Sequence, residues 1–249
     1  MVCPPTNKSA VTTAVLLAAG RGKRLRPHTD VTPKPLLPVN GSPTLDLYCK
    51  GCVEAGITRI VLVAHHLADQ IISYSDKVPE RFDLQCTTVI QQRLDGTASA
   101  LEAARNTNAI QQTLEPAHSF LLMATDYLIP ANFISDLLHF HASHDAAISI
   151  SLKSVPEDEL ASRSSVRFAE DGSISEVVEK PPAGKAPSSL SANLAYVLPA
   201  ALQEYLPQVK ASARGEREIQ TAINAYLAAD GTARGLEQPA PNEWTPGIS

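Results

Sequence analysis

Hydrophobic positions in the first 145 residues follow two alternating patterns. Short apolar runs rich in β-branched residues, as in buried strands, alternate with stretches whose apolar residues recur every three or four positions, as on one face of a helix. The strand-like runs are residues 14–19, 59–65, 86–91 and 119–125, and the helix-like stretches are 44–56, 67–75, 97–105 and 131–142. This alternation predicts βαβ units in a mostly parallel sheet, joined by right-handed crossovers.

The pattern changes after residue 146, where strand-like runs follow one another without intervening helices. They lie at 146–153, 165–180 and 190–198, and two helix-like stretches at 199–209 and 216–230 come after them. The second run is divided by the turn residues Glu170-Asp171-Gly172, which are typical of a hairpin. We therefore expect antiparallel strands that extend the first sheet. The sequence predicts one domain over residues 1–249 with an α/β fold: a Rossmann-like mixed, mostly parallel sheet flanked by helices.

Charge is close to balanced over the whole chain. The 21 lysines and arginines are outnumbered by 26 aspartates and glutamates, and the net charge of −5 does not favour a nucleic-acid partner. No apolar run approaches the roughly 20 residues of a membrane-spanning helix, so we expect no membrane partner. Residues 1–13 lack the apolar core of a secretory signal, and four cysteines do not indicate a disulfide framework. These features predict a cytoplasmic protein.

Two groups of potential metal ligands fall on helix-like stretches. Cys49 and Cys52 form a CxxC, but no second pair completes a zinc site, so we interpret both as buried structural thiols. The histidines of HFHASHD, which are His139, His141 and His144, lack the HExxH spacing of zinc enzymes. We interpret them as part of a solvated helix end.

One loop concentrates positive charge directly behind the first strand-like run. Residues 16–39, LLAAGRGKRLRPHTDVTPKPLLPV, hold five lysines and arginines, two glycines and four prolines. Gly20 and Gly22 would let a phosphate approach the backbone N–H groups at the carboxyl edge of the sheet. Arg24 follows the turn, and Lys34 stands between two prolines in a segment that we expect to be extended. The loop matches neither the Walker A nor the GxGxxG pattern, and its two fixed cations suit a polyphosphate.

This loop resembles the signature of the sugar-1-phosphate nucleotidyltransferases, which include glucose-1-phosphate thymidylyltransferase, muramate-1-phosphate uridylyltransferase and mannose-1-phosphate guanylyltransferase. Four more segments resemble that family in order: QQRLDGTASAL (91–101), MATDYL (123–128), EVVEKP (176–181) and SARGEREI (212–219). The resemblance implies a fold of the nucleotide-diphospho-sugar transferase type. It assigns about residues 1–145 to a nucleotide-binding half and about residues 146–249 to a sugar-phosphate-binding half.

The resemblance also implies the reaction. An oxygen of a sugar-1-phosphate attacks the α-phosphorus of a nucleoside triphosphate, which yields a nucleotide-sugar and pyrophosphate without a protein nucleophile. Such a transfer requires in-line positioning and neutralisation of phosphate charge. The implied catalytic residues are Arg24, Lys34 and Asp126, and the implied nucleotide-binding residues are Leu17, Ala18, Ala19, Gly20, Gly22, Arg24, Gln91 and Gly96.

Each implied role has a chemical rationale and a plainer alternative. Arg24 would stabilise charge on the leaving pyrophosphate and Lys34 would contact the α-phosphate or the attacking phosphate, whereas the alternative for both is an exposed cation. Asp126 would hold Mg²⁺ at a strand end, and its alternative is a helix cap. Gln91 and Gly96 match the family's pyrimidine readers, which favours UTP or dTTP. A glutamine is also common at any strand end.

The sugar-phosphate site implied by the resemblance consists of Glu179, Lys180 and Asn193. The carboxylate would accept bonds from sugar hydroxyls and the ammonium would reach the sugar phosphate, whereas the alternative for this pair is a surface ion pair. Ser164 and Ser165 stand where thymidylyltransferases carry a Tyr-Gly that lines the sugar pocket. The sequence therefore does not assign the sugar.

The last residues also depart from the family. Thr245 and Pro246 follow Trp244 where a second metal aspartate is expected. This difference keeps open a non-catalytic regulator that binds a nucleotide or nucleotide-sugar on the same fold. A third hypothesis is a cytidylyltransferase that acts on a non-sugar phosphate. The first hypothesis implies a nucleoside triphosphate and a sugar-1-phosphate as partners and Mg²⁺ as cofactor, and a homo-oligomer stays among the alternatives.

Overall fold

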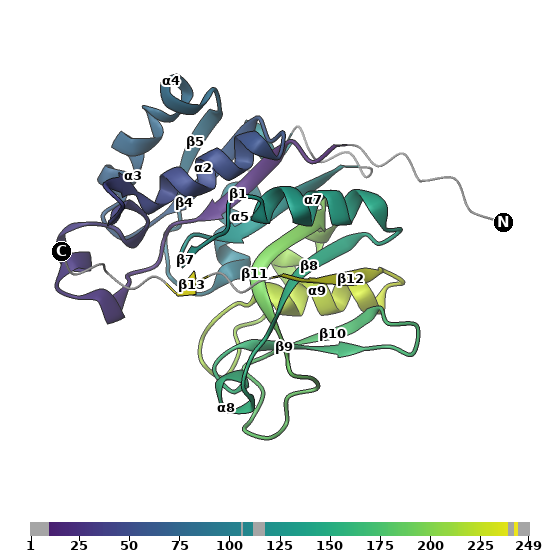
Figure 1. Cartoon of the computed structure of the whole chain (residues 1–249). Coiled ribbons are helices and arrows are strands. Elements are labelled where there is room, and N and C mark those ends of the chain that lie inside the picture. The colour runs from purple at the N-terminus through teal and green to yellow at the C-terminus, as the bar shows by residue number, and fades with distance from the viewer. Residues whose placement is uncertain (1–9, 106, 112–117, 239–241, 244–249) are drawn as a thin grey trace.

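The computed structural model describes residues 10–105, 107–111, 118–238 and 242–243 (Figure 1). A mixed nine-stranded sheet extends through both halves of the chain. Its strands are β1 (Thr13–Leu17), β4 (Arg59–Ala64), β5 (Gln85–Ile90), β6 (Ser119–Ala124), β8 (Ile148–Ser154), β9 (Ser164–Phe168), β10 (Ile174–Glu179), β11 (Leu190–Pro199) and β12 (Ala233–Glu237). The strand order is β10-β9-β11-β6-β1-β4-β5, and β8 pairs with both β11 and β12.

The sheet has a parallel core built from the first half of the chain. Strand β1 pairs in parallel with β4 and β6, and β4 pairs in parallel with β5. In the second half, β11 is antiparallel to β6, β8 and β9, and β9 and β10 form a hairpin whose turn holds Gly172 at φ +77°. The predicted mixed α/β sheet with a parallel core is therefore confirmed, and the antiparallel strands β8 to β11 lie in the second half of the chain.

Helices cover both faces of this sheet (Figure 1). The α-helices are α1 (His28–Val31), α2 (Thr44–Glu54), α3 (Ala68–Ser75), α4 (Val78–Phe82), α5 (Thr97–Arg105), α6 (Asn108–Gln111), α7 (Phe133–Ser143), α8 (Glu157–Leu160) and α9 (Ile219–Ala228). Helices α2, α3, α4 and α7 enclose one hydrophobic core, and α5 and α9 enclose the other. Helix α2 shows why: Leu45, Tyr48, Cys49 and Cys52 recur every three or four residues and are all fully buried.

Short elements connect the larger ones. The 3₁₀ helices are η1 (Lys23–Leu25), η2 (Lys34–Leu36), η3 (Ala200–Glu204) and η4 (Leu206–Gln208), and the small two-stranded pairs are β2 (Pro38–Val39) with β3 (Ser42–Pro43) and β7 (Tyr127–Leu128) with β13 (Asn242–Glu243). The helix predicted over 199–209 is wrong in type, because two 3₁₀ turns form there. Pro207 contributes to this difference, since proline has no N–H for an α-helical hydrogen bond.

Two other local expectations are corrected. The segment around Lys34 is not extended, because Lys34–Leu36 form a 3₁₀ turn after an extended Pro33. His141 is not solvated: it is 3% exposed, and its Nδ1 lies 2.9 Å from the hydroxyl of Ser149 on the neighbouring strand. A histidine on the apolar face of a helix can be buried when a polar partner faces it.

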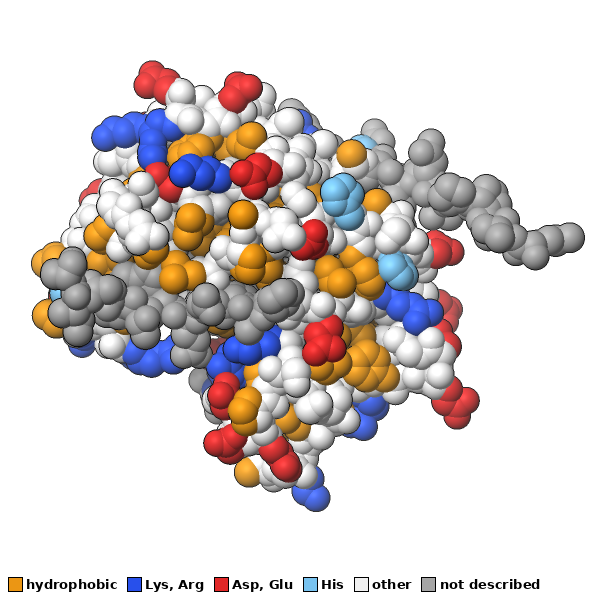
Figure 2. Space-filling view, viewed as in Figure 1, with side chains coloured by type: hydrophobic (Ala, Val, Ile, Leu, Met, Phe, Trp, Pro, Cys, Tyr) orange, Lys and Arg blue, Asp and Glu red, His pale blue; other side chains and the backbone are white. Residues whose placement is uncertain are grey.

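No helix in the part of the chain that the structure describes is long and apolar enough to cross a membrane. On the face drawn in Figure 2, lysine and arginine side chains lie among acidic ones rather than in one continuous basic surface. This mixture agrees with the net charge of −5.

Candidate active site

A cavity of about 960 Å³ opens at the carboxyl ends of β1 and β6. Parallel strands deliver their carboxyl ends to one edge of a sheet, where α/β proteins bind ligands. Every residue that the sequence analysis assigned to a site lies on the wall of this cavity: Leu17, Ala18, Ala19, Gly20, Gly22, Arg24, Lys34, Gln91, Gly96, Asp126, Glu179, Lys180 and Asn193. Segments far apart in the sequence thus meet in one place, while the chemical roles of these residues stay predictions.

The glycine-containing loop has a fixed shape. Gly22 adopts φ +57°, and a Cβ added there would lie 2.8 Å from a methyl carbon of Thr29. The Thr29 hydroxyl donates a 2.9 Å hydrogen bond to the Gly22 carbonyl, and a ring nitrogen of His66 lies 2.8 Å from the Thr29 carbonyl. Arg24 is exposed on the cavity wall, so its guanidinium is accessible to an anion.

Lys34 and Asp126 meet on the cavity wall. The Lys34 ammonium donates a 2.9 Å hydrogen bond to the Asp126 carbonyl and lies 3.7 Å from carboxylate oxygen Oδ2. The other carboxylate oxygen, Oδ1, is shielded from solvent and has no hydrogen-bond partner among the described residues. An ionised carboxylate in this position has an open acceptor beside a fixed positive charge.

A tyrosine on α2 positions the turn that carries Asp126. The Tyr48 hydroxyl donates a 2.7 Å hydrogen bond to the Tyr127 carbonyl and receives one of 3.3 Å from the Tyr127 N–H. Burial raises the pKa of Tyr48 well above its ordinary value, so its hydroxyl keeps the proton that it donates. On the other side of this turn, the backbone of β13 pairs with β7, directly after Asp126.

Gln91 follows β5 and is 4% exposed. Its side-chain nitrogen donates a 3.1 Å hydrogen bond to the Gly96 carbonyl, and the backbone carbonyl oxygen of Gln91 lies 2.7 Å from Nδ1 of His65. Because a carbonyl can only accept, this contact places a proton on Nδ1 of His65. Gly96 adopts φ +120°, and a Cβ there would lie 2.2 Å from the Arg217 carbonyl oxygen. The segment therefore requires glycine at position 96.

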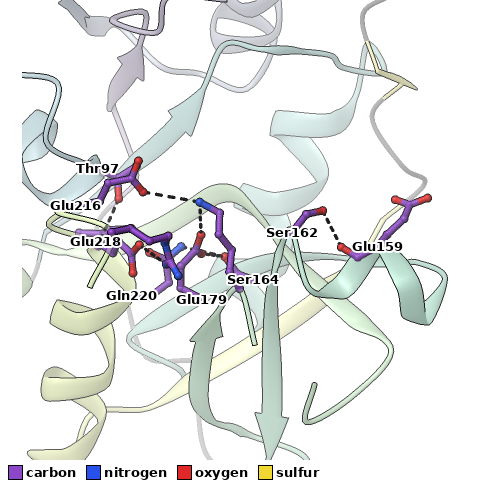
Figure 3. A network of polar contacts seen from close by, with 11 residues as sticks. Thr97, Glu159, Ser162, Ser164, Glu179, Glu216, Glu218 and Gln220 are labelled. Carbon is purple, nitrogen blue, oxygen red and sulfur yellow. Dashed lines mark hydrogen bonds and ion pairs between the residues drawn. The ribbon is translucent and has the colours of Figure 1, made fainter. Parts of the chain in front are cut away.

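A polar network forms the opposite wall (Figure 3). Glu179 accepts a hydrogen bond from the Ser164 hydroxyl, which in turn receives one of 3.1 Å from Gln220. The Lys180 ammonium lies 3.5 Å from Glu179 and 3.7 Å from Glu216. The side chains of Glu179 and Lys180 are 17% and 35% exposed, so the pair lines a cavity rather than an open surface.

Asn193 lies next to this network, where β11 changes its pairing register between Ala192 and Tyr196. It is 5% exposed, and its side-chain nitrogen has no partner among the described residues although it is buried. A buried amide donor without a partner is costly. A ligand or a bound water in the cavity would remove that cost.

Metal ligation by a preformed cluster finds no support in the described part of the chain. Residues 10–105, 107–111, 118–238 and 242–243 contain no group of three or more histidine, cysteine or acidic side chains that could hold a metal ion. Cys49 and Cys52 are free and fully buried, as predicted, and burial raises the pKa of both thiols. Thr245 and Pro246, which mark the family departure, lie outside the described residues.

Some site residues escaped the sequence analysis. In the sequence Tyr48 has the pattern of an ordinary core residue of α2, although its hydroxyl bonds the Tyr127 backbone next to Asp126. Glu216, Glu218 and Gln220 lie on the cavity wall within or next to SARGEREI, which indicated the family but not individual roles. The only available signal was that several polar residues interrupt the start of a helix-like stretch.

Comparison with known proteins identifies the family of this chain. Residues 13–241 match the profile of the nucleotidyl transferase family. The chain is 32% identical over 215 residues to UTP–glucose-1-phosphate uridylyltransferase AglF of Haloferax volcanii, which covers 86% of this chain and 83% of that one. The chain therefore belongs to the nucleotidyl transferase family, within the sugar-1-phosphate nucleotidyltransferases that its motifs resemble.

Three other proteins are also similar to this chain. A solved UDP-glucose pyrophosphorylase in complex with UDP-glucose shares the fold, with a TM-score of 0.76 over 91% of each chain at 19% identity. A 2-aminoethylphosphonate cytidylyltransferase of Lancefieldella rimae is 37% identical over 79 residues, which is 32% of each chain. A second relative from Haloferax volcanii, a low-salt glycan biosynthesis nucleotidyltransferase called Agl11, is matched over 56% of its length at 29% identity.

Proposed function

We propose that the protein transfers a uridylyl or thymidylyl group from UTP or dTTP to a sugar-1-phosphate and releases pyrophosphate. The observation that carries this proposal is the convergence of two cationic loop residues, the pair Gln91 and Gly96, and the Glu179–Lys180 pair around one cavity. The likeness to a UTP–glucose-1-phosphate uridylyltransferase supports UTP as the nucleotide. Glucose-1-phosphate is the first sugar phosphate to test for the same reason.

The transfer needs one bond to form and one to break. A phosphate oxygen of the sugar-1-phosphate attacks the α-phosphorus, and the bond from that phosphorus to the bridging oxygen breaks, with its electron pair leaving on pyrophosphate. Arg24 stabilises the charge on the departing group, while Lys34 holds the phosphates at the reacting centre. Lys180 binds the sugar phosphate, and Glu179 and Asn193 bind sugar hydroxyls. Gln91 and the backbone of Gly96 recognise the imide edge of the pyrimidine.

Mg²⁺ fits the donor set in part. The shielded Oδ1 of Asp126 lacks a hydrogen-bond partner among the described residues, which suits a hard cation that takes one or two protein carboxylates and completes its shell with water and phosphate. When bound, the ion would neutralise phosphate charge. Asp126 would hold it, and the hydrogen bond from Lys34 to the Asp126 carbonyl would keep the Asp126 turn in place.

The experiment is a matrix of nucleoside triphosphates against phosphate acceptors, scored by product mass. UTP, dTTP, CTP, GTP and ATP are each combined with glucose-1-phosphate, other sugar-1-phosphates and 2-aminoethylphosphonate. A UDP- or dTDP-sugar as main product supports the proposal. A CMP-phosphonate product would instead support the cytidylyltransferase hypothesis that the match to the Lancefieldella rimae enzyme motivates. Nucleotide binding without any product would support the non-catalytic regulator.

A further inference from the structure

Arg217 lies between the two sides of the cavity without lining it. Its backbone runs beside the base-reading segment: its N–H donates to the Asp95 carbonyl at 2.5 Å, and its carbonyl accepts from the Ala98 N–H at 2.9 Å. Gly96 lies between these two contacts and leaves the space that Arg217 occupies. The position of Gly96 therefore depends directly on the position of Arg217.

The Arg217 side chain is anchored at several points. Its Nε donates to the Val209 carbonyl at 2.9 Å and its Nη2 donates to the Leu206 carbonyl at 2.7 Å. Its Nη1 donates to the Ser99 hydroxyl at 3.1 Å and pairs with the Glu102 carboxylate. A planar guanidinium with five donors can satisfy such a set at once, which a lysine cannot. The segment that carries Arg217 is thus fixed to α5 and to η4.

The same segment reaches the sugar-phosphate side of the cavity. Glu216 lies 3.7 Å from the Lys180 ammonium, and both residues line the cavity together with Glu218. The backbone at Ser212 and Glu216 closes into a turn through a 2.9 Å hydrogen bond. Displacement of Arg217 would therefore move Gly96 on one side of the cavity and Glu216 on the other.

We propose that Arg217 is a positioning residue that couples the two substrate sites, because it fixes the base-reading segment 91–98 and the segment 212–218, which carries Glu216, in one arrangement. This inference rests on the proposed function for the identity of the two ligands. Nucleotide bound at Gly96 stabilises the Arg217 contacts and thereby orders Glu216 and Lys180. By linkage, a ligand at Lys180 strengthens nucleotide binding to the same degree.

Hydrogen–deuterium exchange with UTP as the probe tests this coupling without requiring turnover. In the unaltered protein, UTP should slow exchange in 91–98 and also in 212–218. In Arg217→Met the protection of 212–218 should be lost, and the apparent KM for both UTP and glucose-1-phosphate should rise about fivefold or more, with a smaller change in kcat. Arg167→Met serves as the control, because Arg167 forms a 3.0 Å ion pair with Glu176 at the exposed β9–β10 hairpin.

A second variant covers the case in which Arg217→Met does not fold. Glu102→Gln removes one anchor of the guanidinium and leaves its backbone contacts, so it should reduce the UTP-induced protection of 212–218 in the same direction. Protection of 212–218 that persists unchanged in these variants would overturn the inference. Protection of 91–98 alone in the unaltered protein would also overturn it while leaving the proposed function intact. UTP that protects neither segment would overturn both.

Discussion

Lys34 and Asp126 are connected across 92 positions of the sequence by a 2.9 Å hydrogen bond from the Lys34 ammonium to the Asp126 carbonyl. The bond uses the backbone oxygen and not the carboxylate, whose nearer oxygen stays 3.7 Å from the ammonium. One residue pair thus places a cation and a carboxylate oxygen without a hydrogen-bond partner among the described residues next to each other. In the proposed nucleotidyl transfer, Lys34 would neutralise phosphate charge near the α-phosphorus, and Asp126 would do so through a bound Mg²⁺.

Mg²⁺ affinity should depend on bound nucleotide. Asp126 offers one carboxylate in competition with water, so the protein alone should bind Mg²⁺ weakly, and UTP should strengthen binding because its phosphates supply the remaining oxygens. Calorimetric titration of Mg²⁺ with and without UTP measures this. Asp126→Asn should abolish most activity with little change in melting temperature, whereas the exposed Asp145→Asn should change neither. Equally tight Mg²⁺ binding with and without UTP would reveal a preformed second ligand.

Arg24→Ala should lower turnover by about two orders of magnitude, the range for loss of one charge-stabilising donor. Arg26→Ala is the matched control, because Arg26 belongs to the same loop and forms an exposed 3.0 Å ion pair with Asp30, which contributes little to stability. Steady-state rates of pyrophosphate release compare the two. Near-normal turnover of Arg24→Ala with only weaker nucleotide binding would rule out the proposed role in charge stabilisation.

UTP or dTTP should be used at least about tenfold better than GTP or ATP, a preference of roughly 1.4 kcal/mol that one or two hydrogen bonds can provide. Gln91→Leu should reduce this ratio, because leucine has a similar size but neither donates nor accepts. The ratios of kcat/KM for the four nucleotides provide the measurement. Faster turnover with GTP would contradict the assignment of Gln91 and Gly96 as pyrimidine readers.

Gly96→Ala should destabilise the protein by at least about 2 kcal/mol, because alanine would combine a strained positive φ with a clash against the Arg217 backbone. Gly184→Ala isolates the first effect: Gly184 has φ +69° but nothing within 4 Å of the added Cβ, so a loss of about 1 kcal/mol is expected there. Urea unfolding curves give both values. An equal loss of unfolding free energy in the two variants would show that the Arg217 backbone moves away from the added Cβ at little cost.

Cys49 and Cys86 should resist alkylation in the native protein at pH 8. Burial raises the pKa of Cys49 to about 11 and that of Cys86 to about 12, so both stay protonated there. In the unfolded chain these thiols ionise near pH 9. The unfolded state then binds fewer protons, and stability should fall as the pH rises above 9. Peptide mass spectrometry after iodoacetamide treatment, with and without denaturant, measures the alkylation. Rapid labelling of the native protein would contradict the burial of Cys49 and the partial burial of Cys86.

Apolar periodicity was sufficient to predict the sheet, its main helices and the half of the chain that turns antiparallel. The reason is that burial imposes a repeat on each element, as at Leu45, Tyr48 and Cys52 in α2. The glycines in the loop 16–39 likewise indicated a tight turn, which forms at Gly22 with φ +57°, whereas phosphate binding by this turn stays a prediction. The burial of His141 on α7 could not be predicted, because it depends on a polar partner, Ser149, that lies on strand β8.

Contacts between segments that are distant in the sequence could not be predicted from the sequence pattern either. Nothing local marks Tyr48 as the residue that holds the Asp126 turn, because it lies among buried residues of α2 and its partner, the Tyr127 carbonyl, is 79 positions away in the sequence. The approach of Arg217 to Gly96 is equally hidden, since it arises only when α9 packs beside α5. These contacts depend on three-dimensional packing, whereas the family motifs indicate only which residues converge.

Release of pyrophosphate distinguishes nucleotidyl transfer between two small molecules from nucleotide binding alone. The protein is incubated with UTP and Mg²⁺, with and without glucose-1-phosphate or another acceptor identified by the substrate matrix. We expect pyrophosphate release only when a sugar-1-phosphate is present, in amounts equal to the nucleotide-sugar formed, and its near-complete loss in Asp126→Asn. Pyrophosphate release at the same rate without any sugar-1-phosphate, or none with any acceptor, would contradict it.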